Sequence, residues 1–397
     1  MNLFEGINVI DLTNNHAGPA CGSILSDFGA DVIHVEKPII GDDNRAYAPV
    51  WNGVSLACAM YNRGKKSVVI DTKDPEGLEV LKQMIMNADI LIESFRPGVM
   101  QKLGLAYDDV KDINPKLIYC SISAFGQKGL YAKRPGYDII AQGFSGFMHK
   151  TGEKDGPPFM TGITIGDAVG AINAFGCIAA ALFHRERTGE GQHIDVALTR
   201  GLMWCNSFFE FINMGIDDRR NGNTNSSFSP YGVFSNDKGE AVVIAALSNS
   251  LWAKVCKILG HEEMTSDPRY ATISSRGENK EDINRMVSQW VNSFENIADA
   301  VSVLEAEGIP NTKVMTHFDL LNDVHVRENN WIVDIPVPDD LIGPETYKTH
   351  GVIADFSLTP GNPIKKTDTL GQHNHEVLGE YLTGDTIDRL EAKWAKK

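Results

Sequence analysis

The chain has 397 residues, of which 42% are hydrophobic and 8% aromatic, so it is long enough for two or three domains with real cores. Its net charge of −15 argues against nucleic acid and anionic membrane surfaces as partners, although a local basic cluster could still bind an anionic small molecule. The first residues lack a basic stretch and a long apolar run, which predicts no signal peptide. The six cysteines are scattered without a C-x-x-C pair, so we expect reduced thiols in a cytoplasmic protein.

Two short apolar runs, residues 7–12 and 32–36, have the pattern of buried strands. The stretch between them is helical in pattern, with Pro19 suited to the first turn, and the three segments together predict a parallel, Rossmann-like sheet. The turn after the first strand lacks the G-x-G-x-x-G fingerprint, which argues against NAD. Such sheets bind ligands at the carboxyl ends of their strands. The residues expected at that edge are Asn14, His16 and Ala17.

Strands and helices continue to alternate along the first half of the chain, which predicts the α/β fold class. Further strands are predicted at residues 67–71, 89–93, 117–122 and 192–197. Helices are predicted at residues 75–87, 99–103, 107–113, 167–183 and 198–214. Residues 127–161 contain several glycines and prolines, so we expect an irregular segment that covers the site.

The stretch Gly162–Phe183 places a lone carboxylate, Asp167, at the predicted start of an apolar helix of small residues. Because this helix is apolar nearly all round, we expect it to be largely buried. Two glycines and an asparagine interrupt the apolar run, which is therefore too short for a membrane span. Asp167 could be an N-cap that accepts a hydrogen bond from a backbone N–H, or a nucleophile in a dry, glycine-lined pocket. This stretch alone leaves both interpretations open.

In the second half, the composition changes near residue 217, where a polar segment indicates a linker. A smaller α/β unit follows, with strands predicted at 231–234 and 241–245 and helices at 249–259, 280–293 and 298–307. Residues 331–366 are expected to be β-rich, and a helix is expected at the end of the chain. His373 and His375 lack an acid or a further histidine at ligand spacing, so we interpret them as surface residues and expect no metal site.

The chain has no G-x-S-x-G, P-loop or zinc signature, but it carries many short motifs in a fixed order. They include Val35-Glu-Lys-Pro38, Arg134-Pro-Gly-Tyr-Asp138 and Gly166-Asp167. The others lie at residues 17–20, 29–33, 41–45, 62–67, 93–98, 123–127, 142–146, 188–192, 195–196, 266–270 and 370–373. Together they resemble the class III (formyl-CoA transferase-like) CoA-transferases, which share a superfamily with the α-methylacyl-CoA racemases.

The resemblance implies a Rossmann-like large domain, a smaller α/β domain, and a homodimer whose protomers interlock like chain links. It places the N-terminal part of the large domain at residues 1–200, a linker at 201–224 and the small domain at 225–320. Residues 321–397 are then a second linker and a C-terminal part that returns to the large domain. The implied partners are an acyl-CoA donor, a carboxylic acid acceptor and a second copy of the chain, without nucleic acid or membrane. The CoA thioester is a substrate, and no cofactor is bound permanently.

The resemblance also implies that Asp167 is the nucleophile. In this family the aspartate attacks the acyl-CoA thioester, which gives a mixed anhydride and CoA thiolate. The thiolate then attacks the aspartyl carbonyl to form an aspartyl-CoA thioester, and the acceptor carboxylate repeats the steps in reverse. This chemistry is physically reasonable, because a desolvated carboxylate is a better nucleophile and backbone N–H groups at a helix start can stabilise an oxyanion.

Other roles follow from matching positions. The implied substrate-binding residues are His16, Tyr137 and Gly166. The implied CoA-binding residues are Asn14, Ala17, Lys37, Lys73 and Lys102, of which the lysines suit CoA phosphates. His16 stands where formyl-CoA transferases have a glutamine, which favours a different acceptor, such as a hydroxy or dicarboxylic acid. Their glycine-rich flap falls at residues 222–227, which are rich in asparagine and serine here.

Two alternatives stay open beside the CoA-transferase. A racemase needs a second base opposite the aspartate, and those enzymes have a histidine where this chain has Tyr137. A tyrosine, with a pKa of ~10, is a poor base near neutral pH, which favours the transferase. A non-catalytic CoA-binding protein is the other alternative, and the intact Gly166-Asp167 counts against it. The sequence does not identify the donor or the acceptor.

Overall fold

The structure, a computed structural model, describes residues 2–51, 53–206, 209–337 and 346–396. The chain forms two compact units. The first contains residues 1–147, 161–207 and 325–397, and the second contains residues 148–160 and 208–324. Residues 148–160, which we expected in the large domain, thus cluster with the second unit, whereas the C-terminal part of the chain clusters with the first.

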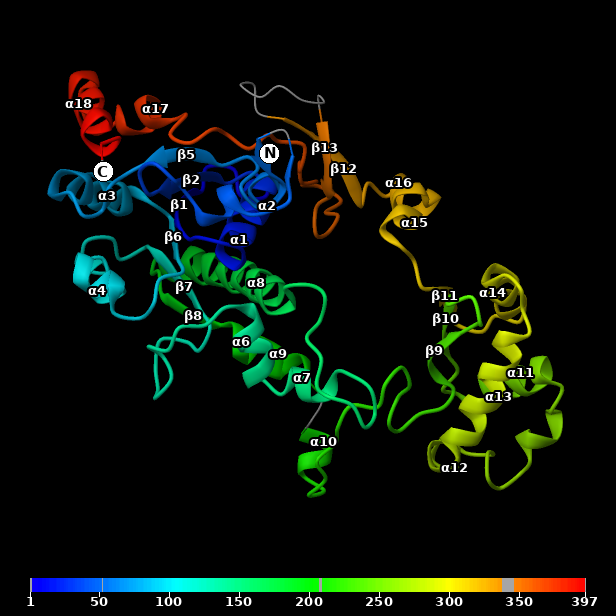
Figure 1. The fold of residues 1–397 in the computed structure, drawn as a ribbon. Helices are drawn as coiled ribbons and strands as arrows, with labels where there is room; N and C mark the ends of the chain where they lie inside the picture. The colour runs from blue at the N-terminus through cyan, green and yellow to red at the C-terminus, as the bar shows by residue number, and fades with distance from the viewer. Residues whose placement is uncertain (1, 52, 207–208, 338–345, 397) are drawn as a thin grey trace. The chain divides into compact units, whose positions relative to one another are not determined.

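A six-stranded parallel sheet is the centre of the first unit (Figure 1), so the predicted parallel sheet is confirmed. Its strands are β1 (Asn8–Leu12), β2 (Asp31–Glu36), β5 (Lys66–Val69), β6 (Ile90–Glu93), β7 (Ile118–Ser123) and β8 (His193–Ala197). They lie in the order β5-β2-β1-β6-β7-β8, which is the strand order of Rossmann folds. The order reverses between β1 and β6, so the carboxyl ends of these two strands flank the crevice in which such sheets bind ligands.

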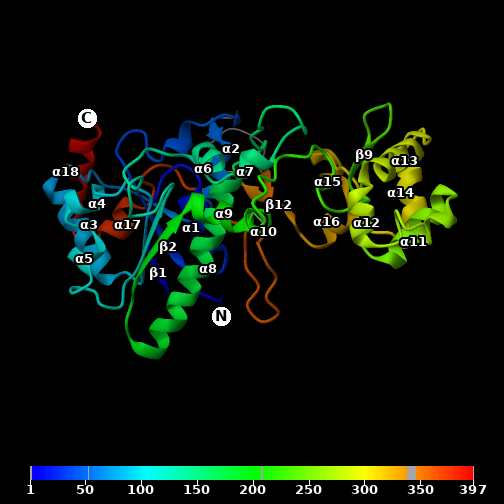
Figure 2. The same ribbon diagram turned by 90° about the horizontal axis from the view of Figure 1, so that it is seen from below.

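On one face of the sheet, α1 (Ala17–Asp27) and α8 (Ile165–Thr188) pack against each other and against the strands (Figure 1 and Figure 2). Strand side chains such as Val9 and Ile92 fill this core. Consecutive strand residues point to opposite faces, so Ile10, next to Val9, belongs to the core on the other side. The two-sided burial explains why the strands are apolar almost throughout.

On the opposite face lie α3 (Pro75–Asn87), α17 (Asn374–Leu378) and α18 (Gly384–Trp394), and Figure 1 shows α18 beside α3. The start of α3 follows the sequence signal, because Asp74 caps the helix and Pro75 occupies its first turn. Trp394 is buried and its Nε1 donates to Asp74 Oδ2 at 2.8 Å. The end of the chain is therefore anchored on the N-terminal half of the first unit.

Helix α8 is less buried than the sequence analysis expected. Its buried side includes Ala174 and Ile178, which pack toward α1 and the sheet. Its other side leaves Ile172 53% exposed and Phe183 66% exposed, so the expectation of a largely buried helix is wrong. With 24 residues, the helix is long and apolar enough to cross a membrane by length and composition alone. The sequence analysis had instead predicted that the interrupted apolar run is too short for a membrane span. One such helix is weak evidence for a membrane span, because the core helix of a soluble protein passes the same test.

Short elements complete the first unit. Between β2 and β5 lie η1 (Asp43–Ala46), β3 (Val50–Trp51), β4 (Val54–Ser55) and α2 (Leu56–Tyr61). Between β6 and β8 lie α4 (Val99–Leu103), α5 (Tyr107–Val110), α6 (Asp138–Phe144), α7 (Phe147–Lys150) and α8, although residues 148–150 of α7 cluster with the second unit. The segment 127–161, expected to be irregular, thus contains α6 and α7. The single helix expected over 198–214 is instead α9 (Leu198–Cys205) and α10 (Phe209–Ile212), and residues 207–208 lie outside the described residues.

A hairpin of β12 (Ile332–Pro336) and β13 (Thr346–His350) packs on α2, where Tyr347 donates a hydrogen bond to Ala59 O at 3.1 Å. Residues 351–366 contain no strand, so the β-rich expectation for 331–366 holds only for this hairpin among the described residues. Residues 338–345 of that stretch lie outside the described residues.

The second unit is built on an antiparallel sheet in the order β11-β10-β9, covered by helices. Its strands are β9 (Tyr231–Ser235), β10 (Ala241–Ala245) and β11 (Asn311–Lys313). Its helices are α11 (Asn249–Leu259), η2 (Glu262–Thr265), α12 (Ile273–Glu278), α13 (Lys280–Asn292), α14 (Ile297–Ala306) and α15 (His317–Asn322), and α16 (Val324–Glu328) follows. The segment 222–227 belongs to this unit, and a flap role for it stays a prediction.

Candidate active site

A cavity of about 270 Å³ opens at the carboxyl ends of β1 and β6, where the strand order reverses. Its polar lining comes from the turns after β1 and β6, the end of β7, the segment before α6 and the first turn of α8. These polar residues are Asn14, Asn15, His16, Ser94, Arg96, Ser123, Arg134, Tyr137 and Asp167. The three residues expected at this edge, Asn14, His16 and Ala17, all line the cavity.

Asp167 lies in the first turn of α8 without capping it. The helix begins at Ile165 after Thr164, so Asp167 is its third residue, and no described residue donates a hydrogen bond to its carboxylate. The interpretation of Asp167 as the N-cap is therefore wrong. Its side chain is 16% exposed, and burial, together with the negative charge of Asp138, raises its pKa to about 7. The result is a poorly solvated carboxylate that faces a cavity.

The carboxylate that does cap α8 belongs to Asp138, at the start of α6. Its Oδ1 accepts hydrogen bonds from the backbone N–H of Gly166 at 2.6 Å and of Asp167 at 3.3 Å. Its Oδ2 accepts from Gln142 Nε2 at 2.6 Å. Gly166 permits this approach, because a Cβ there would lie 2.9 Å from Asp138 Oδ1. The sequence analysis chose the neighbouring Tyr137 and missed Asp138, since a contact across 28 residues leaves no local pattern.

His16 lies beside Asp167 in the site. Its Nδ1 lies 3.7 Å from Asp167 Oδ2 and 2.8 Å from Thr164 Oγ1. The ring of Tyr61 packs on the imidazole with ring centroids 3.9 Å apart. Burial lowers the pKa of His16 to about 4, although the charge of Asp138 acts in the opposite direction. His16 is therefore neutral at neutral pH and does not form an ion pair with Asp167.

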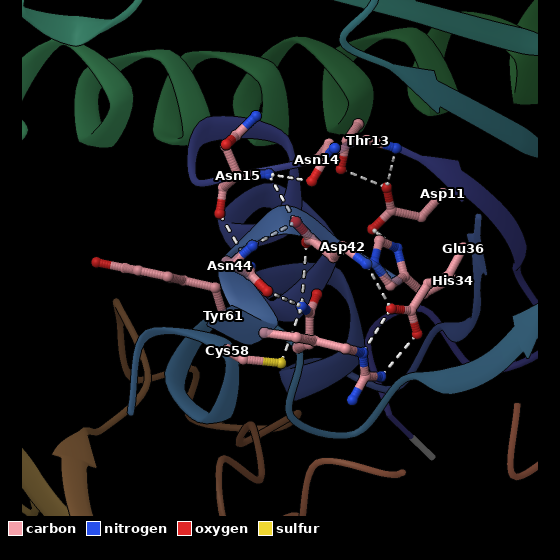
Figure 3. A network of polar contacts seen from close by, with 12 residues as sticks. Asp11, Thr13, Asn14, Asn15, His34, Glu36, Asp42, Asn44, Cys58 and Tyr61 are labelled. Carbon is pink, nitrogen blue, oxygen red and sulfur yellow. Dashed lines mark hydrogen bonds and ion pairs between the residues drawn. The ribbon is translucent and has the colours of Figure 1, made fainter. Parts of the chain in front are cut away.

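A polar network holds the turn that carries His16 (Figure 3). Asn15 adopts the left-handed conformation, with φ 76°, which asparagine tolerates better than most residues. Its backbone N–H donates to Asp42 Oδ1 at 2.9 Å, and its carbonyl accepts from Asn44 Nδ2 at 2.9 Å. The turn is thus fixed by hydrogen bonds to the loop after β2, and the position of His16 depends on that loop.

Buried charges lie beneath this turn (Figure 3). Lys65 Nζ donates to Asp11 Oδ2 at 2.8 Å, and His34 lies 3.5 Å from both Asp11 and Asp42. Burial opposes the charge on His34, but the two carboxylates outweigh it and raise its pKa to about 9. The imidazolium then balances the second carboxylate. Removing one member would leave a buried charge without its partner, at a cost of about 3–5 kcal/mol, so the network stabilises the turn that Asp42 holds.

A second cavity of about 510 Å³ lies at the carboxyl ends of β1, β2 and β5. Phe95 lines both cavities, which are therefore neighbours. Lys37 and Lys73 line the second cavity, and their role in CoA binding stays a prediction. Lys37 forms an ion pair with Asp43 at 2.5 Å, whereas the exposed Lys73 has no acidic partner among the described residues. Apolar residues supply most of the other lining, which suits a flat aromatic group.

The remaining predicted residues lie at different places. Tyr137 lines the first cavity and is 66% exposed. Gly166 is buried and lines neither cavity, so its small size serves the Asp138 cap. Lys102 is exposed at the end of α4 and lines neither cavity, although its neighbour Leu103 lines the second. Sequence reasoning missed two arginines of the first cavity, and neither has an acidic partner among the described residues: Arg96 and Arg134.

The surroundings of His373 and His375 differ in part from the prediction. Asp388 and Glu391 on α18 come close to His375, whose Nε2 lies 3.0 Å from Asp388 Oδ1. Sequence spacing gives no sign of these two acids, because they come from a separate helix. His375 and Asp388 are exposed, as expected for a surface histidine, and none of the three residues lines either cavity. His373 is only 18% exposed and its Nδ1 lies 3.5 Å from Asp368 Oδ2, so the interpretation of His373 as a surface residue is wrong.

The sequence matches the family described as CoA-transferase family III over residues 4–374. The chain belongs to this family. As a family III CoA-transferase, it is 37% identical to the succinate--glutarate CoA-transferase of Agrobacterium fabrum, over 97% of this chain and 96% of that protein. It is 32% identical to the succinyl-CoA--D-citramalate CoA-transferase of Chloroflexus aurantiacus, over 98% and 97% of the two chains. A solved structure, a CAIB/BAIF family protein from Brucella suis, superposes with a TM-score of 0.82 at 31% identity and covers 96% of this chain and 100% of that one.

These similarities confirm the resemblance found in the sequence. The chain is a class III CoA-transferase with a parallel central sheet, and enzymes of this kind use CoA thioesters as substrates. The Rossmann strand order does not require NAD as a ligand, and the turn after β1 already argued against NAD binding.

Proposed function

We propose that this CoA-transferase moves CoA from an acyl-CoA thioester to a free carboxylic acid through covalent intermediates on Asp167. The proposal rests on the environment and the raised pKa of the Asp167 carboxylate. It lies in a cavity at the switch point of the sheet, receives no hydrogen bond from the described residues, and has a pKa raised to about 7. A carboxylate of this kind is less stabilised by solvent than one in water and is a better nucleophile.

The steps balance without an added cofactor. An oxygen of Asp167 attacks the thioester carbonyl, the carbon–sulfur bond breaks, and CoA leaves as the thiolate. The thiolate attacks the aspartyl carbonyl of the mixed anhydride, which releases the donor acid and forms an aspartyl-CoA thioester. The acceptor carboxylate attacks that thioester, and the thiolate then takes the acceptor acyl group and restores Asp167.

The two neighbouring cavities support a placement of the acyl-CoA. The thioester lies in the first cavity, beside Asp167, and the pantetheine chain passes Phe95 into the second. The adenine packs on the apolar lining there, and Lys73 with Lys37 binds the phosphates as point charges. Lys102, at the end of α4 and next to the lining residue Leu103, adds positive charge near this cavity. In a chain of net charge −15, such a local cluster is needed to attract an anionic substrate.

A dicarboxylic acid is the acceptor that the site supports best. The two relatives described above are named for glutarate and D-citramalate. Arg96 and Arg134 provide positive charge in the same cavity as Asp167, and neither is neutralised by an acid of the described chain. His16, in place of a glutamine, provides a neutral polar contact beside the reacting carboxylate.

The racemase alternative has less support. Racemisation places two bases on opposite faces of one carbon. The base nearest to Asp167 is His16, and a separation of 3.7 Å leaves no room for a substrate carbon between them. Tyr137, at the position where racemases have histidine, is 66% exposed. The position of Asp167 in a cavity, together with its raised pKa, favours a catalytic role over a non-catalytic one.

The apolar surface beside α8 supports a homodimer. A groove of about 470 Å³ runs between α8 and α9, lined by Ile172 and Val169. Trp204 on the same groove is 88% exposed, which is unusual for a tryptophan of a monomer. We propose that a second copy of the chain covers this groove, in agreement with the dimer implied by the sequence motifs.

A transfer assay tests the proposal. The purified enzyme is incubated with succinyl-CoA and a series of monocarboxylic, hydroxy and dicarboxylic acids, and new acyl-CoA is measured by mass spectrometry. We expect transfer to short dicarboxylic acids, none in Asp167→Asn, and an altered acceptor profile in His16→Gln. Full activity of Asp167→Asn would overturn the proposed nucleophile. An unchanged acceptor profile in His16→Gln would overturn the role of His16 in acceptor choice.

A further inference from the structure

The backbone N–H groups at the start of α8 are already engaged. The sequence analysis expected them to stabilise the oxyanion that forms when Asp167 attacks. In the structure, the N–H groups of Gly166 and Asp167 both donate to Asp138 Oδ1, and that of Ile165 donates to Ile163 O at 2.9 Å. The next N–H, of Ala168, donates to the carbonyl of Thr164. A hydrogen-bond donor for the oxyanion must therefore come from elsewhere in the cavity.

His16 offers such a donor. Its ring lines the cavity beside Asp167, and the Tyr61 ring at 3.9 Å fixes the plane of the imidazole. Its Nδ1 faces Thr164 Oγ1 at 2.8 Å. The other ring nitrogen, Nε2, has no hydrogen-bond partner within the part of the chain that the structure describes. Nε2 is thus available to a substrate atom.

The chemistry of Nε2 depends on the tautomer. A neutral imidazole has one N–H and one lone pair, and the partner of one nitrogen decides the state of the other. The hydroxyl of Thr164 has no other hydrogen bond among the described residues, and Thr164 makes no side-chain cap at the start of α8. If its O–H donates to Nδ1, the proton of the ring is on Nε2. The opposite arrangement would turn a lone pair toward the acyl oxygen and repel it.

We propose that Thr164 donates its hydroxyl proton to a hydrogen bond with His16 Nδ1 and so holds the ring proton on Nε2, which makes His16 a neutral donor to the acyl oxygen. This inference rests on the proposed attack by Asp167. No proton is transferred: the N–H hydrogen bond strengthens as negative charge develops on the oxygen of the thioester carbonyl. A charged imidazolium in the same place would pair with Asp167 and weaken the nucleophile, whereas a neutral His16 leaves the Asp167 carboxylate unpaired. Thr164 acts through His16 and is a positioning residue.

Two variants separate this role from a structural one. Thr164→Val keeps the shape of the side chain and removes the hydroxyl, and Thr164→Ser keeps the hydroxyl. Because Thr164 makes no side-chain cap, Thr164→Val is expected to fold and to melt close to the wild type. We expect Thr164→Val to lower kcat by about 10–100-fold, as for other partners that orient a functional histidine, and to leave KM for acyl-CoA unchanged. Thr164→Ser is expected to retain kcat.

The tautomer itself is read by NMR of protein labelled with ¹⁵N-histidine, near neutral pH and without substrate. The chain has 11 histidines, so the His16 signals are assigned by their loss in His16→Gln. We expect a protonated Nε2 and an unprotonated Nδ1 in the wild type and in Thr164→Ser, and a mixture of tautomers in Thr164→Val. A proton on Nδ1 in the wild type, or an unchanged kcat in Thr164→Val, would overturn the inference. The NMR result does not depend on the fate of Asp167, so failure of the aspartyl mechanism is detected separately, by the absence of a covalent adduct.

Discussion

Replacement of Asp138 tests how the site controls its nucleophile. Asp138 accepts hydrogen bonds from Gly166 N, Asp167 N and Gln142 Nε2, and its charge is one of the two causes of the raised pKa of Asp167. Asp138→Ala leaves these donors without an acceptor. Loss of a helix cap costs about 0.5–2 kcal/mol and each unsatisfied buried donor about 1–3 kcal/mol, so we expect a loss of roughly 2–4 kcal/mol. At about 2–4 °C per kcal/mol, the melting temperature falls by roughly 5–15 °C.

Asp138→Asn keeps one acceptor oxygen and removes the charge. Its new amide group faces Gln142 Nε2, so we expect a smaller loss of stability, about 1–2 kcal/mol. The ionised form of Asp167 appears as the pH rises through its pKa, so kcat/KM of the wild type rises through about pH 7 and levels off above it. Without the negative charge of Asp138, the pKa of Asp167 falls and the rising limb moves to lower pH.

The assay is a pH profile of kcat/KM for acyl-CoA, measured beside thermal unfolding. Asp112→Asn, a change at an exposed acid outside both cavities, is the matched control and should alter neither measurement. The reasoning is refuted if the rising limb of Asp138→Asn stays at the wild-type pH or moves to higher pH. It is also refuted if Asp138→Ala unfolds at the wild-type temperature.

Two further variants test the CoA site and the dimer. Lys73→Ala removes a cation from the second cavity and should raise KM for acyl-CoA about fivefold, equivalent to the roughly 1 kcal/mol of an exposed charge contact, without a change in kcat. Lys111→Ala, directly after α5 and outside this cavity, is the control. Equal KM values in both variants would contradict the placement of CoA. Trp204→Glu introduces a charge into the exposed groove beside α8. Light scattering after gel filtration should show a dimer for the wild type and a monomer for the variant. A monomeric wild type or a dimeric variant would contradict the proposed interface.

The parallel sheet could be predicted because its signals are local. The apolar runs at 7–12 and 32–36 became β1 and β2, and the Asp74-Pro75 start of α3 is visible in sequence since the cap and the helix are neighbours in the chain. The carboxyl ends of parallel strands lie at one edge of the sheet, so the edge at which Asn14 and His16 lie could also be predicted.

The cap of α8 could not be predicted in the same way. A lone aspartate near the start of an apolar helix has the pattern of an N-cap, but the capping oxygen comes from Asp138, in another helix. Sequence patterns identify which residues suit a role and do not show which of two acids occupies it. For the same reason the sequence did not predict Thr164 and Tyr61 as neighbours of His16, because these contacts join segments far apart in the chain.

The burial of α8 shows a second limit of prediction from the sequence. Its residues are apolar nearly all round, and the sequence therefore predicted a largely buried helix. Only one side packs on α1 and the sheet, and Ile172 and Phe183 remain exposed in the single chain. Hydrophobicity predicts that a surface is removed from water, but it does not distinguish the core of the chain from an interface with a second copy.

The central claim is that Asp167 forms a covalent intermediate, and peptide mass spectrometry tests it most directly. The enzyme is mixed with acyl-CoA without an acceptor and quenched with hydroxylamine or borohydride, which convert an activated aspartyl carbonyl to a hydroxamate or an alcohol. The account predicts this change in mass on the peptide that contains Asp167, and none in the Asp167→Asn variant. An unmodified Asp167 in an enzyme that still transfers CoA, or the same change at another carboxylate, would contradict it.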